Sequence, residues 1–182
     1  MKKQNWDNIE EAQEYERPAA GGYICRITNV VDEEEKEYLK IEYDFAEGKF
    51  KNYWRELYNS KQFWGGNFIR SYKPKALPFF KGFKTAVEQS NTGYVFDEEN
   101  LNGLNRKLVG LVLGEEEYLT NDGTVKTRLY VAQVLSIYRI KDGDFKVPPL
   151  KKLSNKSQDT FMNIVSDNMG DFVPVADDDL PF

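Results

Sequence analysis

The chain contains no histidine among its 182 residues. This absence excludes His-based acid–base chemistry, Ser-His-Asp and Cys-His nucleophiles, and most zinc sites. Cys25 is the only cysteine, so no internal disulfide can form. A single cysteine in a β-rich segment is most simply a small buried hydrophobic residue.

Long hydrophobic runs are also missing. No stretch of about 18 apolar residues occurs, so no membrane span is predicted. The two N-terminal lysines are not followed by the apolar segment of a secretory signal. We therefore expect a cytoplasmic protein. Hydrophobic residues make up 40% of the chain and aromatic residues 14%, which is enough for one folded domain with a core.

Positive charge is scarce only at the C-terminal end. Residues 157–182 contain six Asp and no Lys or Arg, whereas residues 1–156 contain 24 acidic and 25 basic side chains. The net charge of -5 therefore resides in a tail, and the rest of the chain is close to neutral. The overall acidity does not argue against a polyanionic partner.

What the chain has in excess is a band of cations and rings at residues 49–84. This band carries seven Lys and two Arg against one acid, Glu56, and it holds eleven of the 26 aromatic residues. Cations attract phosphates, and flat rings stack on unpaired bases. Any single ring is as well explained by core packing. The density of both residue types together favours a groove for single-stranded nucleic acid.

The hydrophobic pattern predicts a mainly β domain. Strands are expected at residues 23–31, 38–45, 50–58, 107–113 and 125–137, with a helix at 76–90 and a loop with two glycines at 59–75. Asn121, Asp122 and Gly123 form a strong hairpin signal. A helix between the third and fourth of five strands is the element order of the OB-fold, a five-stranded Greek-key barrel that binds oligonucleotides.

Composition divides the chain into three parts. Residues 1–21 form a polar N-terminal arm, residues 22–147 the OB-fold domain, and residues 148–182 an acidic tail that we expect to be disordered by itself. Two acidic clusters have simple explanations. Residues 115–117 are interpreted as a solvated run after a strand. Asp97, Glu98 and Glu99 suit a helix N-terminus better than a metal site.

The chain ends in Ala-Asp-Asp-Asp-Leu-Pro-Phe, with three acids before an apolar tip that carries the free carboxylate. This peptide resembles the C-terminal tip of bacterial and phage single-stranded DNA-binding proteins. The Pro-Ala-Ala-Gly-Gly-Tyr sequence at 18–23 is similar to the phage-encoded members. The resemblance implies that the tip docks on replication, recombination and repair proteins, in a host cytoplasm if the gene is phage-borne. The docking residues would be Asp177, Asp178, Asp179, Leu180, Pro181 and Phe182.

We therefore expect a protein without enzymatic activity, cofactor or metal that binds and protects single-stranded DNA with little sequence preference. The candidate contacts are cations for phosphates and rings for bases. They are Lys51, Tyr53, Trp54, Arg55, Lys61, Phe63, Trp64, Arg70, Tyr72, Lys73, Lys75, Lys126 and Arg128. Assembly into a homo-oligomer is compatible with the sequence.

Two other functions remain open at this point. A non-catalytic OB-like or β-sandwich module could bind carbohydrate or protein through exposed rings, although this does not explain the lysines or the tail. A nuclease could use Asp97, Glu98 and Glu99 with Mg²⁺. No spacing of acids in the sequence is characteristic of such an enzyme.

Overall fold

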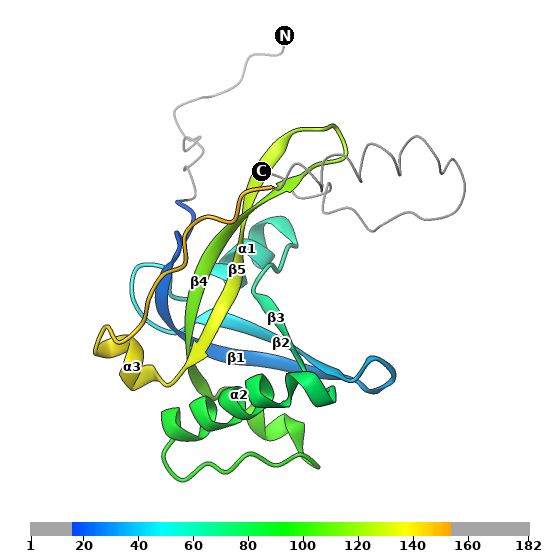
Figure 1. The fold of residues 1–182 in the computed structure, drawn as a ribbon. Helices are drawn as coiled ribbons and strands as arrows, with labels where there is room; N and C mark the ends of the chain where they lie inside the picture. The colour runs from blue at the N-terminus through cyan, green and yellow to red at the C-terminus, as the bar shows by residue number, and fades with distance from the viewer. Residues whose placement is uncertain (1–15, 154–182) are drawn as a thin grey trace.

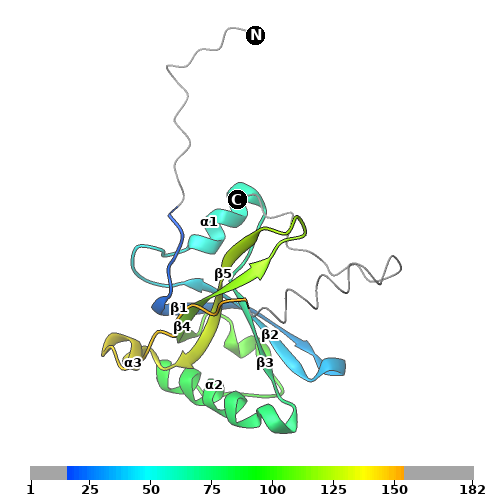
Figure 2. The same ribbon diagram turned by 45° about the horizontal axis from the view of Figure 1, so that its top comes forward.

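The computed structural model describes residues 16–153, which form one five-stranded antiparallel sheet with helices at its ends (Figure 1). The sheet order is β3-β2-β1-β4-β5. Its strands are β1 (Gly21–Glu33), β2 (Tyr38–Phe45), β3 (Asn67–Ser71), β4 (Leu108–Leu119) and β5 (Val125–Leu135). In Figure 2, the β4–β5 hairpin crosses the direction of β1 and β2 at a steep angle. The strands β3 and β5 are the two edges of the sheet.

The predictions for β1 and β2 are confirmed, and β2 has the predicted bounds. Leu39, Ile41, Tyr43 and Phe45 are buried on one face of β2, as their alternation indicates. The register of β1 against β2 shifts between Ile27 and Asn29, which marks a β-bulge. Beyond this shift β1 pairs with β2 as far as Glu33, and β3 pairs with the same part of β2 on its other side. The turn of the β1–β2 hairpin is the 3-10 helix η2 (Glu34–Lys36), which projects from the body (Figure 1).

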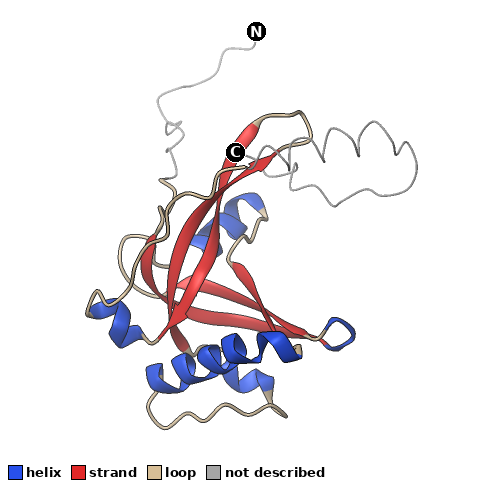
Figure 3. Cartoon of the chain, viewed as in Figure 1, coloured by secondary structure: helices blue, strands red, loops and turns tan. Residues whose placement is uncertain are grey.

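The predicted helix at 76–90 is also confirmed. It is α2 (Leu77–Ser90), which follows the short helix η3 (Pro74–Ala76). Phe83, Ala86 and Val87 are buried at helical spacing, and Phe83 packs edge-on against Phe68 of β3 at 6.2 Å. This helix covers one end of the sheet, as Figure 3 shows. The connection to β4 contains η4 (Leu101–Leu104), whose Leu104 is fully buried.

The prediction of a strand at residues 50–58 is wrong, because this segment forms the helix α1 (Tyr53–Lys61). Tyr53, Trp54 and Leu57 are its buried residues, and they lie on one helical face. Tyr53 and Trp54 are adjacent and would point to opposite faces of a strand, whereas both are buried on one face of this helix. The helix packs against Phe45 of β2, whose ring lies 6.5 Å from Trp54.

The third strand is instead Asn67–Ser71, inside the segment that was predicted to be a loop. Only Phe68 is buried in this five-residue strand, so its sequence pattern is too weak to be recognised. The sheet nevertheless has five strands with a helix between the third and the fourth, as the sequence predicted. The additional element is α1, which lies between β2 and β3.

The fourth strand is longer than predicted, because Glu115, Glu116 and Glu117 belong to β4 rather than to a solvated run. Each is half-buried and pairs with a residue of β5, for example Glu116 with Arg128. The predicted hairpin turn after them is confirmed, and Gly123 adopts a left-handed φ of 83° there. Strand β5 ends at Leu135, and the short helix α3 (Ile137–Lys141) follows.

The segment after α3 covers the outer face of β1 and β4. A Cβ atom on Gly22 would lie 2.3 Å from the Phe145 ring, and one on Gly114 would lie 2.8 Å from Pro148 Cγ. Lys151 then forms a parallel bridge with Glu116 of β4. It thus lies beside a part of β4 that is past Leu113, where the pairing of β4 with β1 ends. The predicted tail begins at residue 148. Residues 148–153 run beside β4 in this way, and residues 154–182 lie outside the described residues.

Candidate functional site

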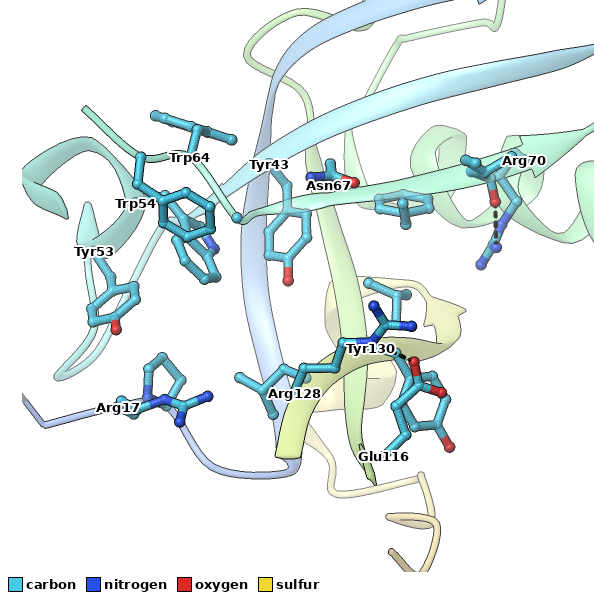
Figure 4. A pocket seen from close by; sticks show the side chains of 17 residues that line it. Arg17, Tyr43, Tyr53, Trp54, Trp64, Asn67, Arg70, Glu116, Arg128 and Tyr130 are labelled. Atoms are coloured by element: carbon cyan, nitrogen blue, oxygen red, sulfur yellow. Dashed lines mark hydrogen bonds and ion pairs between the residues drawn. The ribbon is translucent and has the colours of Figure 1, made fainter. Parts of the chain in front are cut away.

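A pocket of about 470 Å³ lies at the seam where the edge strands β3 and β5 approach without pairing. We refer to it as the seam pocket. Its walls come from five parts of the chain: residues 17–18, Tyr43 of β2, α1 with the loop after it, β3, and the β4–β5 hairpin. Figure 4 shows Tyr43 and Trp54 on one side of the pocket and Arg128 with Glu116 on the other.

Aromatic side chains line the side of the pocket formed by α1 and β2. Tyr43, Tyr53 and Trp54 are buried, whereas Phe63 and Trp64 are half-buried. The rings interlock edge to face: Trp54 lies 4.9 Å from Tyr53 and 6.3 Å from Phe63. Buried rings form the floor of the pocket, and the half-buried rings offer surface to a ligand.

The two glycines after Trp64 are required by packing, not by flexibility. A Cβ on Gly66 would lie 2.3 Å from Trp54 Cδ1 and 2.4 Å from the carbonyl oxygen of Tyr43. A Cβ on Gly65 would lie 2.8 Å from Trp54 Cζ3. The indole of Trp64 donates to the Gly66 carbonyl at 3.1 Å, which holds this ring beside the same loop.

A buried carboxylate fixes the start of α1 and thereby its rings. Asp44 is 4% exposed, and its Oδ1 accepts hydrogen bonds from the backbone N–H groups of Phe45 (2.8 Å) and Trp54 (3.0 Å). Its Oδ2 accepts one from the N–H of Arg55 at 3.2 Å. Burial raises the pKa of Asp44, and the three N–H donors oppose that rise. The carboxylate replaces an ordinary N-cap, since Asn52 makes no capping bond with its side chain.

Three guanidinium groups, from Arg17, Arg70 and Arg128, face the pocket against one carboxylate, that of Glu116. Arg17 donates to the carbonyl of Thr127 at 3.4 Å, and Arg128 donates to Glu116 at 2.9 Å. Arg70 forms no ion pair within residues 16–153, and its guanidinium lies 5.0 Å from the centre of the Phe68 ring. Burial lowers the pKa of Arg70 to about 10, so the group stays charged at neutral pH.

Two buried donors in this pocket have no acceptor among the described residues. They are Nε of Arg70 and Nε1 of Trp54, whose side chain is 9% exposed. Burial raises the pKa of the Tyr43 hydroxyl, and the Trp54 indole opposes that rise. An unpaired buried donor costs free energy, so the site is suited to a ligand rich in acceptor oxygens.

The structure brings together six of the residues predicted from the sequence and separates the others from them. The seam pocket contains Tyr53, Trp54, Phe63, Trp64, Arg70 and Arg128. The remaining predicted contacts do not line it: Lys51, Arg55, Lys61, Tyr72, Lys73, Lys75 and Lys126. Among these, Tyr72 donates to Asp32 at 2.9 Å, so its hydroxyl is held by the β1–β2 hairpin.

Sequence reasoning missed Arg17, Tyr43 and Tyr130 as pocket residues. Arg17 belongs to the polar arm, in which nothing in the pattern distinguishes one residue from the next. Tyr43 alternates with the buried residues of β2, and this pattern indicates only a core position, whereas its ring also lines the pocket at the open seam. Tyr130 follows Lys126 and Arg128 on one face of β5, and this alternation was the one available signal.

Other kinds of site find no support in the described part of the chain. Within residues 16–153, no group of three Cys, Asp or Glu side chains could hold a metal ion. No helix there is long and apolar enough to cross a membrane.

The predicted docking peptide, Asp177 to Phe182, lies outside the described residues. No protein-family model matches the chain, and no curated protein is significantly similar to it.

Proposed function

We propose that this protein binds single-stranded DNA in the seam pocket, with little sequence preference and without catalysis. The observation that carries the proposal is the combination found in one cavity: aromatic walls packed edge to face, three guanidinium groups and buried donors that lack an acceptor among the described residues. Nucleic acid supplies both complements, because its phosphates offer acceptor oxygens and its unpaired bases offer flat faces.

The phosphate contacts are assigned to Arg17, Arg70 and Arg128. Arginine presents a planar fork of donors that matches phosphate geometry. Arg70 has the strongest case, since its charge is not paired with a carboxylate in the described chain and its Nε donor is unsatisfied. Arg128 would exchange its contact with Glu116 for a phosphate, and the exposed half of its side chain permits this movement.

Base stacking is assigned to Phe63 and Trp64, the half-buried rings on the α1 side of the pocket. Tyr53 and Trp54 lie beneath them and hold the floor in shape. Each stacked base contributes about 1–3 kcal/mol, and stacking accepts any base because all bases have a flat face. A preference for particular sequences would require contacts to base edges.

We also propose that the sheet is an OB-fold. Its strand order becomes that of a five-stranded barrel if the edges β3 and β5 are joined, and these are the edges between which the pocket lies. A bound strand of DNA would then occupy the opening of the barrel. The role in replication, recombination and repair, with partners recruited by Asp177 to Phe182, is supported by the sequence of the tail alone.

The proposal predicts that oligo(dT) quenches the intrinsic tryptophan fluorescence and that binding weakens steeply with salt. On single strands, each phosphate contact adds about -0.7 to the slope of log affinity against log salt concentration. Three arginine contacts therefore give a slope of about -2 or steeper. Titrations with single-stranded DNA, duplex DNA and RNA at several salt concentrations measure this. Unchanged fluorescence and no mobility shift at low salt would rule the proposal out.

One variant makes the fluorescence signal specific to the pocket. The chain has three tryptophans, and Trp6 lies outside the described residues. In a Trp6→Phe variant only Trp54 and Trp64 report, and both line the pocket. The quenching should persist in this variant with the same midpoint. A glycan panel tested beside the oligonucleotides distinguishes the carbohydrate-binding alternative.

A further inference from the structure

A second charged surface lies away from the seam pocket, at the projecting end of the β1–β2 hairpin. Residues 32–37 there carry five acidic side chains and one lysine. Asp32, Glu34, Glu35 and Glu37 are exposed, and the one ion pair within residues 32–37 joins Lys36 to Glu33 at 3.8 Å. We refer to these residues as the acidic tip. Such a tip repels DNA, so it requires a different explanation from the pocket.

A basic patch lies directly beside the acidic tip. It consists of three exposed lysines and two exposed apolar side chains on η3 and the first turns of α2: Lys73, Lys75, Leu77, Phe79 and Lys81. Leu77 is 49% exposed and Phe79 is 75% exposed, the latter an unusual position for a phenylalanine. No acidic residue occurs between 71 and 87. None of the three lysines forms an ion pair with a described residue.

The two surfaces are held next to each other but do not neutralise each other. The N–H of Tyr72 donates to the carbonyl of Glu37 at 3.0 Å, and its hydroxyl donates to Asp32 at 2.9 Å. Tyr72 immediately precedes Lys73, so these two hydrogen bonds link the acidic tip to the start of the patch. Figures 1 and 2 both show the hairpin projecting past the N-terminal end of α2. The turn at residues 34–36 therefore lies beyond the start of α2, and no ion pair among the described residues joins it to the lysines of the patch.

We propose that the acidic tip and the basic patch form an interface between two copies of this chain, related by a two-fold axis. In such an interface the same surface is used twice, so the tip of each copy meets the patch of the other. Because the acidic tip and the basic patch lie side by side, a two-fold rotation places each of them opposite the group of opposite charge on the other copy. Phe79 and Leu77 supply apolar area between the two charged contacts, together with Val31, which is 41% exposed on β1.

This interface leaves the seam pocket accessible, because none of its residues lines that pocket. It also gives Lys73 and Lys75 a role other than the phosphate contacts predicted from the sequence. A dimer would present two seam pockets to one DNA strand, which raises avidity without new contacts. The interface is independent of the proposed function, since it would form whether or not the pocket binds DNA.

The test uses two charge-reversal variants of the full chain. The tip variant is Glu34→Lys with Glu35→Lys, and the patch variant is Lys73→Glu with Lys75→Glu. Sedimentation velocity should show a wild-type dimer at low salt that dissociates at about 1 M salt, where the Debye length is about 3 Å. The tip variant brings the net charge of residues 32–37 from -4 to zero, and the patch variant brings that of its three lysine positions from +3 to -1. Each variant alone thus loses the charge attraction in both contacts, so its dissociation constant should rise at least about tenfold. An equimolar mixture restores one contact with its original charges, an acidic tip against a basic patch, and should form more dimer than either variant alone.

A matched control is Lys141→Glu with Lys146→Glu, which makes the same change of charge at two exposed lysines outside this surface. It should sediment as the wild type does. A wild-type chain that remains monomeric at high concentration, a mixture that remains monomeric, or a control that also dissociates would each overturn the proposal. So would a patch variant that loses DNA affinity while its sedimentation is unchanged.

Discussion

Replacing Gly66 with alanine should destabilise the protein by about 3 kcal/mol, an overpacking cost at the upper end of the usual range. The added Cβ would lie 2.3 Å from Trp54 Cδ1 and 2.4 Å from the Tyr43 carbonyl oxygen, and the second atom belongs to the backbone and cannot rotate away. Tyr43 N–H also donates to the Gly66 carbonyl at 2.8 Å, so a shift of this loop breaks a contact with β2. Urea unfolding measures the loss as a lower midpoint at unchanged slope.

The same substitution at Gly82 provides the matched control. Gly82 lies inside α2, and a Cβ there meets no atom within 4 Å. Because alanine favours a helix over glycine, Gly82→Ala should stabilise the protein by about 0.5–1 kcal/mol. The two Gly→Ala variants should thus move the unfolding midpoint in opposite directions. If Gly66→Ala unfolds at the wild-type midpoint, the described packing of Trp54 against the glycine loop is wrong.

Arg70→Gln should lower the affinity for oligo(dT) at least about tenfold at low salt, since a hydrogen bond to a charged group contributes about 1.5–3 kcal/mol. The salt slope should also fall in magnitude by about 0.7, the value for one phosphate contact on a single strand. Stability should be retained, because the substitution removes a half-buried charge that has no carboxylate partner in residues 16–153. Fluorescence titration and urea unfolding of the same sample measure both quantities.

Arg55→Gln is the control for that experiment. Arg55 is exposed on α1 and was an equally good candidate from the sequence, but it does not line the seam pocket. Removing its charge should change the affinity much less than removing that of Arg70. Equal losses in the two variants would show that binding depends on the overall charge of the band at 49–84. The seam pocket would then have no special role.

The sheet could be predicted largely from alternation and turn chemistry. Leu39, Ile41, Tyr43 and Phe45 alternate without interruption, and Asn121, Asp122 and Gly123 specify the hairpin before β5. The failure at α1 has a physical cause. Its buried residues Tyr53, Trp54 and Leu57 span only one turn, and its cap is Asp44, a residue from another element. A cap supplied by β2 cannot be recognised in the local sequence.

The position of the site was predictable only in part. The density of rings and cations identified the correct region, since Phe63, Trp64 and Arg70 line the pocket. The opposite wall could not be found in the same way. Arg17 and Arg128 are distant in sequence, and they meet because β5 ends the sheet opposite β3. The sequence shows two adjacent glycines, Gly65 and Gly66, in a predicted loop. It does not show why a larger residue is excluded there, which is that Trp54 of α1 packs directly against both.

Photocrosslinking of a single-stranded oligonucleotide substituted with iodouracil tests the central claim most directly, because each crosslink identifies the ring that touches a base. We expect crosslinks on Phe63 and Trp64, the half-buried rings that follow α1 in the seam pocket. The exposed rings of Phe79 and Tyr138, which lie outside the pocket, serve as internal controls and should remain unmodified. Crosslinks that fall on these two rings and spare Phe63 and Trp64 would contradict the account.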